Sequence, residues 1–493
     1  MWRSLNRRGS LIYQHILQLA NTTPDRVAIR RNGLDLSYRC FADAILLARG
    51  ELLEQQLVRP GVVGVAIVDL QEFWITALAL RSLGATTLAI RSPDVLPELI
   101  HSGIASVVGD ETWAELWDAC HQLHLRLSPA PSRLGVPPNS AGPPPLDGGH
   151  ILLSSGTTCR SKMVLYNSPA DEVAIGQSLS TDANTMYHVF DYGPWTVAGY
   201  LIATHVWAKG GGIIIDQDAK WREVLRDLSG THAGLLPAFL SEILAAPEGS
   251  FPRNENLHVF VGGGTITATE ISDAKRRISP HIYNWLGSTE VGMIACTPLE
   301  EPDDHRWHRI DPTRVVEIVD ELGQAVPIGQ VGSLRVAVSD GPSKYYNDPE
   351  ATAAFFRDGY FYPGDLAAAR GDGRIALQGR TTEVINIKGT KFALAPFEDH
   401  LREVFDFTGV CLFSMQDDDG QEQLNLVVES TQPLPPHLLE LLQRKFPIVP
   451  LRVFTVAALP RTSTGKIIRT DVQAGVLAAS NSNVSGHQLG VAS

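Results

Sequence analysis

Short runs of apolar and β-branched residues alternate along this chain with longer segments of helical character. Residues 62–68 precede a helix-like segment at 72–83, and residues 211–215 precede another at 221–228. Strands that alternate with helices usually pair side by side, so the pattern predicts an α/β fold of mainly parallel sheets with flanking helices. With 493 residues, the chain is long enough for at least two domains.

Two changes in composition indicate where the domains divide. Residues 128–149 are rich in proline and glycine, which predicts an exposed linker within the first domain. After residue 379, short strand-like segments alternate with helix-like stretches. The strand-like segments are 383–387, 409–415 and 424–428, and the helix-like stretches are 396–404 and 436–445. We therefore predict a large N-terminal domain over residues 1–379, a small α+β domain over 380–478 and a flexible tail over 479–493.

Charge and hydropathy argue against several functional classes. The chain carries 41 Lys and Arg against 54 Asp and Glu, a net charge of −13 that disfavours nonspecific binding to nucleic acid. Its best apolar run, at 62–80, is interrupted by Asp69, Gln71 and Glu72, so no membrane span is expected. Five scattered cysteines without metal spacing, and a start without a secretory apolar core, predict a cytoplasmic protein with reduced thiols.

The strongest local signal is a hydroxyl-rich turn that follows an apolar strand. Small hydroxyl residues, glycine and a lysine can offer N–H, O–H and ammonium donors to phosphate oxygens. The segment does not fit the GxxxxGK[ST] phosphate loop, and a solvated Ser/Thr turn is the alternative interpretation. The candidate phosphate-binding residues are Ser154, Ser155, Gly156, Thr157, Thr158 and Lys162.

Three later segments carry chemically useful side chains. Thr289 and Glu290 follow a glycine turn, and a hydroxyl beside a carboxylate suits a phosphate and Mg²⁺. Asp365 follows Gly364, where a fixed carboxylate can accept hydrogen bonds from ribose hydroxyls. Lys466 lies in a Thr-, Ser- and Gly-rich loop near the end of the chain. Taken singly, each is also compatible with an ordinary solvated turn or loop.

Taken in order, these segments resemble the adenylate-forming superfamily of acyl-CoA synthetases, luciferases and nonribosomal peptide adenylation domains. Residues 332–336 are similar to its Gly-Glu-Leu stretch, and residues 345–352 to its Gly-Tyr…Pro-Glu-x-Thr stretch. The resemblance extends from Leu36 to Lys466, which is nearly the whole chain. It identifies the sequence as a stand-alone member of that superfamily.

The resemblance implies a ligase that uses ATP and Mg²⁺ in two steps. A carboxylate attacks the α-phosphorus of ATP to form an acyl-adenylate and pyrophosphate, and a thiol then takes the acyl group. The hydroxyl-rich loop would hold the β- and γ-phosphates, and a preorganised lysine charge would stabilise the transition state. The resemblance assigns nucleotide contacts to Gly287 and Ser288, the α-phosphate to Thr289, Mg²⁺ to Glu290, ribose to Asp365 and Arg380, catalysis to Lys466 and the domain hinge to Thr382.

The chain departs from the family pattern at several of these positions. Cys159 to Met163 replaces Gly-x-Pro-Lys-Gly in the phosphate loop, and Leu286-Gly287-Ser288 lacks the usual tyrosine near adenine. Thr382 stands where Asp or Lys is common, and Asn386 where many members carry a lysine used in thioester formation. The change at Asn386 concerns the second step and CoA as the acceptor.

The segment around Asp191 resembles the Phe-Asp stretch of amino-acid-activating members, whose aspartate binds the substrate ammonium. A carboxylate in an aromatic pocket is costly unless a cation meets it, which agrees with that role. The alternative is that Asp191 caps a helix or forms an internal pair. Trp285 at the pocket floor favours a small or short acid over an aromatic one, and a flat ring stacked on the tryptophans is the alternative. The other expected lining residues are Tyr192, Trp195, Ala238, Phe260, Gly262, Met293 and Ile294.

The expected function is therefore activation of a carboxylic acid, with a small amino acid preferred. The segment after Arg469 contains no serine of the phosphopantetheine-attachment type, so we expect the acceptor thiol on a separate carrier protein. One alternative is an aryl or short-chain acyl-CoA synthetase that uses coenzyme A, and another is a noncatalytic binding relative. No nucleic-acid or membrane partner is expected.

Overall fold

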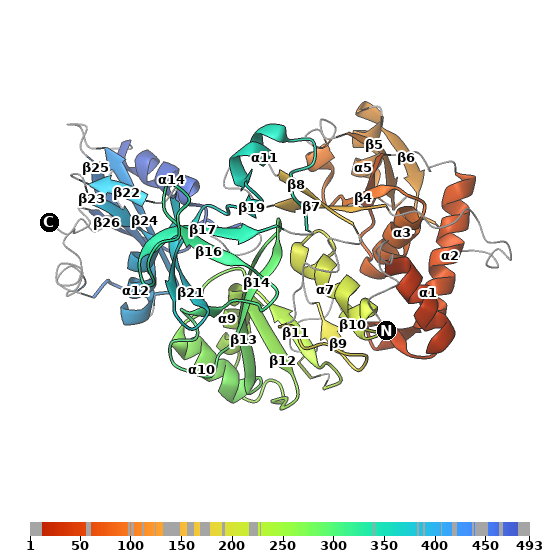
Figure 1. Cartoon of the computed structure of the whole chain (residues 1–493), viewed down its shortest axis with the longest axis horizontal. Helices are drawn as coiled ribbons and strands as arrows, with labels where there is room; N and C mark the ends of the chain where they lie inside the picture. Colours follow the sequence, from red (N-terminus) through yellow and green to blue (C-terminus); the bar gives the residue numbers. More distant parts are fainter. Residues whose placement is uncertain are drawn as a thin grey trace.

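A computed structural model describes most of the chain. The described residues are 12–55, 61–96, 99, 103–110, 113–123, 125–131, 148–154, 162–167, 178–189, 193–215, 225–226, 228–338, 341–381, 384–387, 390–405, 407–416, 422–435, 438, 452–462 and 467–481. Figure 1 shows two large sheets with helices around them, an antiparallel sheet beside them, and the C-terminal elements at the opposite end from α1 (Ile12–Thr22) and α2 (Tyr38–Glu54).

The first large sheet has six strands in the order β6-β5-β3-β4-β7-β8. Its neighbours are parallel except for β8, which pairs antiparallel with β7. The all-buried run of β3 has the continuous apolar character of a central parallel strand. The strands are β3 (Val62–Ala66), β4 (Thr86–Ala89), β5 (Ile104–Gly109), β6 (Arg126–Pro129), β7 (His150–Ser154) and β8 (Lys162–Tyr166).

The second large sheet has eight strands in the order β14-β13-β12-β11-β9-β10-β1-β2. Its central strands are parallel, and the two edge strands β14 and β2 are antiparallel to their neighbours. The strands are β1 (Val27–Arg31), β2 (Leu34–Ser37), β9 (Met186–His188), β10 (Gly212–Ile215), β11 (His232–Leu235), β12 (His258–Gly262), β13 (His281–Ser288) and β14 (Gly292–Pro298).

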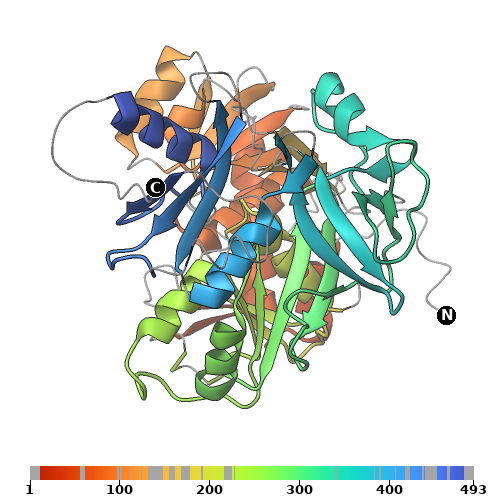
Figure 2. The same ribbon diagram turned by 90° about the vertical axis from the view of Figure 1, so that its left-hand side faces the viewer.

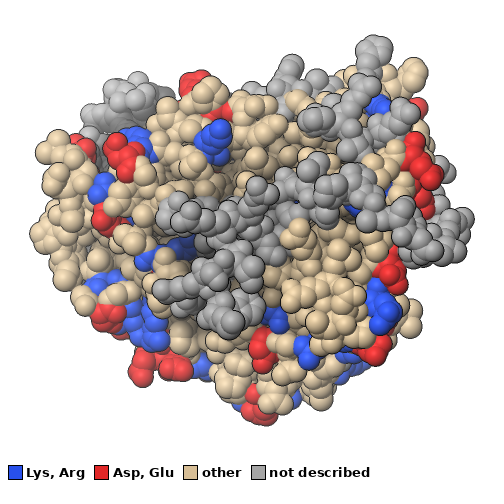
Figure 3. All heavy atoms as spheres, turned by 45° about the vertical axis from the view of Figure 1, so that its right-hand side comes forward, with Lys and Arg blue, Asp and Glu red and all other residues tan. Residues whose placement is uncertain are grey.

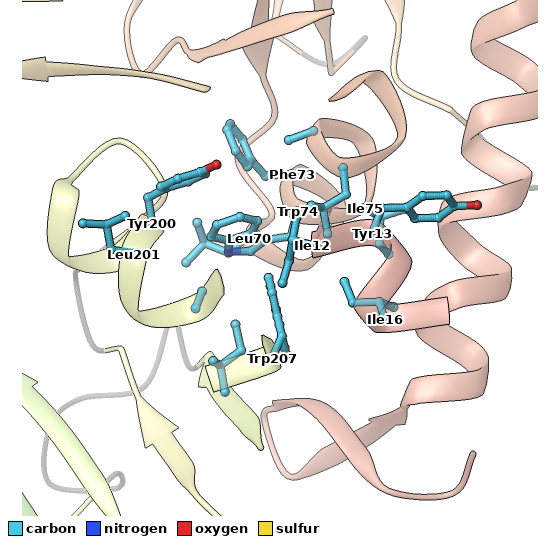
Figure 4. Packing of buried hydrophobic residues seen from close by; sticks show 14 of the residues in the cluster. Ile12, Tyr13, Ile16, Leu70, Phe73, Trp74, Ile75, Tyr200, Leu201 and Trp207 are labelled. Atoms are coloured by element: carbon cyan, nitrogen blue, oxygen red, sulfur yellow. The ribbon is translucent and has the colours of Figure 1, made fainter. Parts of the chain in front are cut away.

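Two buried helices pack against each other and join the two sheets. α3 (Leu70–Ser82) covers β3 and β4, and α7 (Val197–Ala208) covers β10. Trp74 of α3 stacks on Tyr200 of α7 at 5.8 Å between ring centroids and meets Trp207 edge-on at 5.0 Å (Figure 4). A helix that is apolar on nearly every side must lie between layers, so these two helices form the centre of the largest core cluster.

The remaining helices cover the outer faces and several begin at side-chain caps. Thr267 and Glu270 form a reciprocal capping box at the start of α10, and Ser37 caps α2. α10 packs on α9 and on β13. The bounds are α5 (Ala114–Gln122), α9 (Pro237–Ala245), α10 (Ala268–Arg277) and α11 (Pro349–Phe355), with the short 3₁₀ helix η1 at Pro93–Val95.

A third sheet of seven strands is antiparallel throughout its pairings. It packs its buried residues against β14 through Val336 and Phe361, which share a cluster with Val291 and Ile294. The strands are β15 (His308–Arg309), β16 (Val316–Val319), β17 (Val331–Ala337), β18 (Phe356–Arg357), β19 (Tyr360–Phe361), β20 (Asp365–Arg370) and β21 (Arg374–Arg380).

The elements after β21 form two small sheets and two helices. β22 (Val384–Ile387) pairs antiparallel with β23 (Thr390–Ala393), and β24 (Gly409–Gln416), β25 (Glu422–Glu429) and β26 (Arg452–Val456) form a mixed sheet. α12 (Ala395–Phe405) and α14 (Arg469–Asn481) pack on β24. Arg469 forms an ion pair with the buried Glu398 at 2.6 Å, which ties α14 to α12.

α12 also contacts the body formed by the earlier elements. It lies against β21, as Figure 2 shows from the C-terminal side. Arg402 donates to the hydroxyl of Thr265 at 2.7 Å, and Glu403 accepts hydrogen bonds from the guanidinium of Arg306. These exposed or half-exposed polar contacts, rather than a continuous apolar core, join α12 to the 265–306 region.

The fold agrees with the class predicted from sequence. The expected strands at 62–68 and 211–215 appear as β3 and β10, and the expected helix at 72–83 as α3. The stretches 221–228 and 436–445 lie largely outside the described residues. Ser128 and Pro129, at the start of the predicted linker, are instead the end of β6, because they pair with Val108 and Gly109 of β5. The boundary at residue 379 stays a prediction.

Candidate active site

The predicted phosphate loop connects the two strands of a hairpin at the edge of the six-stranded sheet. β7 and β8 pair antiparallel, with Ser154 directly opposite Lys162. Ser154 is buried, and the ammonium of Lys162 lies 4.6 Å from the ring centroid of Phe355 and 5.8 Å from that of Tyr345. Ser155, Gly156, Thr157 and Thr158 lie outside the described residues. The hairpin therefore presents a hydroxyl and a cation at the two ends of the loop.

A buried histidine fixes the base of this hairpin. The Nε2–H of His150 donates to the carbonyl of Pro194 at 2.8 Å, so its Nδ1 accepts from the Thr87 hydroxyl at 2.8 Å. The ring stacks on Tyr200 at 4.4 Å. Burial lowers the pKa of His150 to about 3, with the nearby charge of Arg81 acting in the same direction. The neutral ring thus joins β7 to the segment that leads to Trp195.

The Thr289–Glu290 pair forms the turn between β13 and β14. Gly287 is needed just before it, because a Cβ there would lie 2.7 Å from the carbonyl oxygen of Gly292. Glu290 is 7% exposed, and its Oε1 accepts a hydrogen bond from the hydroxyl of Tyr345 at 2.8 Å. The carbonyl of Thr289 accepts from the hydroxyl of Tyr166 at 2.9 Å.

Tyr166 and Tyr345 bring the predicted phosphate and metal residues together. Tyr166 is the last residue of β8, and Tyr345 forms an isolated antiparallel bridge to Val164 in the same strand. Burial, and then the charge of Glu290, raise the pKa of the Tyr345 hydroxyl well above its usual value, so this group stays a donor. The sequence analysis did not select either tyrosine. Tyr345 lies in a family-like stretch that could have indicated it, whereas Tyr166 carries no local signal.

The two residues expected to bind ribose lie next to each other. Asp365, at the start of β20, lies opposite Arg380, at the end of β21, and their side chains form an ion pair at 3.2 Å. The Thr381 amide donates to the carbonyl of Gly364 at 2.8 Å, which closes the same end of the hairpin. Thr382 and Lys466, the predicted hinge and catalytic lysine, lie outside the described residues.

Part of the predicted substrate pocket lies on one face of β12 and β13. Gly262 pairs with Trp285, and a Cβ on Gly262 would lie 1.6 Å from atoms of the indole. The ring of Phe260 stacks on Tyr283 at 4.7 Å on that face. Trp285 therefore fills the space that a larger residue at position 262 would need.

The adjacent strand and helix contribute unequally to this lining. Met293 is buried in the same cluster as Phe260 and Trp285, whereas Ile294 packs on the other face of β14 with Val336. Adjacent residues of a strand point to opposite faces, so the structure does not bring Ile294 to the lining. Ala238 is exposed in the first turn of α9.

Trp195 also packs against this core cluster. Its ring covers Gly193, where a Cβ would lie 2.2 Å from the indole, and the guanidinium of Arg91 lies 4.3 Å from its centroid. Trp195 and Trp285 both pack against the cluster that contains α3 and α7. Asp191 and Tyr192 lie outside the described residues.

Charge and membrane features add little to this site. On the face in Figure 3, acidic and basic side chains are interspersed rather than gathered by sign. Within the described ranges, no cluster of three or more His, Cys, Asp or Glu side chains is arranged to hold a metal ion. Among those same residues, no helix has the length and apolar character needed to cross a membrane.

Comparison with known proteins shows where the chain belongs. Residues 17–346 match the family described as AMP-binding enzyme. The chain belongs to the AMP-binding enzyme family. This confirms the resemblance to adenylate-forming enzymes drawn from the four sequence segments, and it makes the protein a member of an enzyme family.

The individual relatives of this family member are distant. Pyochelin synthase PchD of Pseudomonas aeruginosa is 29% identical over 358 residues, which cover 65% of this chain and 62% of that protein. A medium/long-chain-fatty-acid–CoA ligase of Mycobacterium tuberculosis is 28% identical over 303 residues, covering 57% of this chain and 53% of that protein. The chain thus matches less than two thirds of the length of these relatives.

The solved structures of family members confirm the fold. O-succinylbenzoate coenzyme A synthetase of Bacillus subtilis, in complex with ATP and a magnesium ion, superposes with a TM-score of 0.82. The superposition covers 93% of this chain and 99% of that one, at 16% sequence identity. At this identity the likeness concerns the fold alone. The fold is the α/β arrangement that the sequence predicted.

Proposed function

We propose that this family member activates a carboxylic acid with ATP as an acyl-adenylate and releases pyrophosphate. The observation that carries the proposal is the set of contacts that β8 makes through two tyrosines. Through Tyr166 and Tyr345, this strand connects the phosphate-loop hairpin to the Thr289–Glu290 turn. Phosphoryl-centre chemistry depends mainly on positioning and charge neutralisation, which such contacts serve.

The residues present fit a magnesium–ATP substrate. Mg²⁺ commonly binds through one or two carboxylates together with substrate phosphates, and Glu290 supplies one buried carboxylate beside the Thr289 hydroxyl. When bound, the metal would neutralise phosphate charge. Lys162 adds a cation at the end of the phosphate loop, and Asp365, oriented by Arg380, offers an acceptor for ribose hydroxyls.

The acid best supported is a small amino acid. Trp285 occupies the space above Gly262, where a larger substrate group would otherwise extend in the expected pocket. Asp191 would meet the ammonium group, because a carboxylate among aromatic residues needs a cation. Fatty and simple aryl acids carry no such group, so the two classes of substrate are distinguishable by experiment.

Exchange of labelled pyrophosphate into ATP tests the first step directly. The purified chain would be assayed with a panel of amino acids and matched deaminated acids of the same size. We expect exchange that depends on added acid and on Mg²⁺, with small amino acids preferred. Exchange only with deaminated acids would overturn the amino-acid assignment, and no exchange with any acid would overturn the proposed activation.

The acceptor thiol is proposed to lie on a separate carrier protein. The second candidate is coenzyme A, which is favoured by the 28% identity to a medium/long-chain-fatty-acid–CoA ligase. Transfer of a radiolabelled acyl group to a holo-carrier protein, with its apo form as the control, would support the first. Release of an acyl-CoA with no carrier loading would support the second.

A further inference from the structure

Tyr345 makes a short, buried contact with the carboxylate assigned to Mg²⁺. Its hydroxyl donates to Oε1 of Glu290 at 2.8 Å, and the two residues are 3% and 7% exposed. A hydrogen bond to a buried charged group is stronger and more directional than one between neutral groups. The contact therefore restricts which way the Glu290 carboxylate can face.

The phenol ring has little freedom to move. It meets Phe355 edge-on at 6.0 Å and Phe356 at 5.3 Å between ring centroids. Its backbone is tied to β8 by the bridge to Val164, and the neighbouring Tyr346 amide donates to the carbonyl of Met163 at 2.8 Å. Tyr345 is thereby fixed to the strand that begins at the phosphate loop.

The residues that follow Tyr345 explain why its backbone is held. Asp348 caps α11 by accepting from the amide of Ala351, and Pro349 occupies the first helical turn. Thr352 returns to the start of the segment, where its hydroxyl accepts from the Tyr345 amide at 3.0 Å. The Asp-Pro-Glu-Ala-Thr pattern thus serves as a support for the tyrosine.

The same aromatic rings also contact the lysine of the phosphate loop. Lys162 lies over Phe355 at 4.6 Å and near Tyr345 at 5.8 Å, within the range of cation–π attraction. Tyr345 therefore touches both the cation at the end of the loop and the carboxylate at the turn. These two groups are far apart in sequence, and both interact with the Tyr345 side chain.

We propose that Tyr345 is a positioning residue for the metal–nucleotide site, holding the Glu290 carboxylate in a fixed position relative to Lys162 of the β7–β8 hairpin. The inference rests on the proposed function of Glu290 and adds a residue to it. Tyr345 acts through its hydroxyl on Glu290, and its ring supplies packing and the surface for Lys162. These two contributions can be separated by removing the hydroxyl alone.

Tyr345→Phe keeps the ring and removes one donor. We expect the Mg²⁺ concentration for half-maximal pyrophosphate exchange to rise about 10-fold or more, the effect of losing a hydrogen bond to a charged group. The rate of pyrophosphate exchange at saturating Mg²⁺ should change much less, because the Glu290 carboxylate remains. Tyr360→Phe is the matched control, since it removes a tyrosine hydroxyl that donates to Glu317 at 3.2 Å.

A binding measurement separates failure of this inference from failure of the proposed function. Calorimetric titration of ATP at low and high Mg²⁺, without any acid, should show weaker binding to Tyr345→Phe only at low Mg²⁺. Equal Mg²⁺ dependence in wild type, Tyr345→Phe and Tyr360→Phe would overturn the positioning role. If wild type binds Mg²⁺-dependent ATP but exchanges with no acid, the proposed activation fails while this inference stands.

Discussion

The indole of Trp285 lies directly over Gly262, at the position that a side chain on residue 262 would occupy. The two residues face each other on neighbouring parallel strands, β12 and β13. Each therefore limits the other: glycine admits the indole, and the indole shortens the predicted pocket. This relationship is the physical basis for expecting a small acid.

Gly262→Ala should force the Trp285 ring to move. Overpacking a buried site commonly costs about 1–3 kcal/mol, so the free energy of unfolding in urea should fall by that amount. In a Trp285→Ala background the same substitution should cost much less, which a double-mutant cycle would measure.

Gly475→Ala provides the matched control for this substitution. Gly475 is exposed in α14, and a Cβ there has no neighbour within 4 Å. Alanine should stabilise that helix by up to about 1 kcal/mol. A Gly262→Ala variant with the same free energy of unfolding as the wild type would contradict the close contact with Trp285.

Glu290→Gln should weaken the use of Mg²⁺–ATP, because the amide keeps the shape but removes the charge that suits the metal. Pyrophosphate exchange measured across a Mg²⁺ series should shift to higher concentrations, with partial recovery at the highest ones. Glu301→Gln, at an exposed turn, serves as the control. Normal exchange at low Mg²⁺ would make Glu290 a structural residue only.

Asp191→Asn should reduce activity most with the preferred amino acid. Removing one partner of a buried charge pair typically costs about 3–5 kcal/mol, which corresponds to several hundredfold or more in kcat/KM. The deaminated analogue should lose far less or gain, since it meets a neutral amide. Equal losses with both substrates would place Asp191 outside the ammonium site.

Lys466→Ala should lower the adenylation rate by roughly 10²–10³-fold, the effect of losing one preorganised contact to developing charge. The circular dichroism spectrum and the unfolding midpoint should stay unchanged. The exposed Lys209 offers a control substitution at the end of α7. A Lys466→Ala variant with the wild-type adenylation rate would remove this lysine from the mechanism.

Acid should destabilise the protein through buried histidines. Burial lowers the pKa of His150 to about 3 and, with the charge of His258, that of His232 to about 4. Both pKa values lie below the unfolded value of about 6.5, so unfolding takes up protons as the pH falls from that value. Each group should then reduce the free energy of unfolding by about 1.4 kcal/mol per pH unit until its folded pKa is reached.

Urea unfolding between about pH 7 and pH 4 measures this slope. His150→Gln is the informative variant, because an amide can both donate and accept in place of the neutral ring but does not titrate. For this variant, the free energy of unfolding should change less steeply with pH than in the wild type, by the contribution of one proton taken up on unfolding. An identical slope would show that His150 is not among the groups that titrate on unfolding.

Sequence alone determined the features that depend on neighbouring residues. The alternating apolar segments predicted β3, α3 and β10, and the Thr-Glu segment lies at the turn that follows β13. The resemblance also assigned Asp365 and Arg380 to one ribose, and the structure places the two side chains in an ion pair. These signals are local because strand and turn preferences are set by the residues within each element.

Only the tertiary structure decided which of these local features meet. Tyr166 reaches Thr289 across 123 residues and Tyr345 reaches Glu290 across 55, contacts that arise from how separate sheets pack together. The tertiary structure also separates Met293 from Ile294. These neighbours in β14 point to opposite faces of the strand and pack in different core clusters. Side-chain contacts of this kind depend on the position of whole layers, and no single segment of sequence encodes that position.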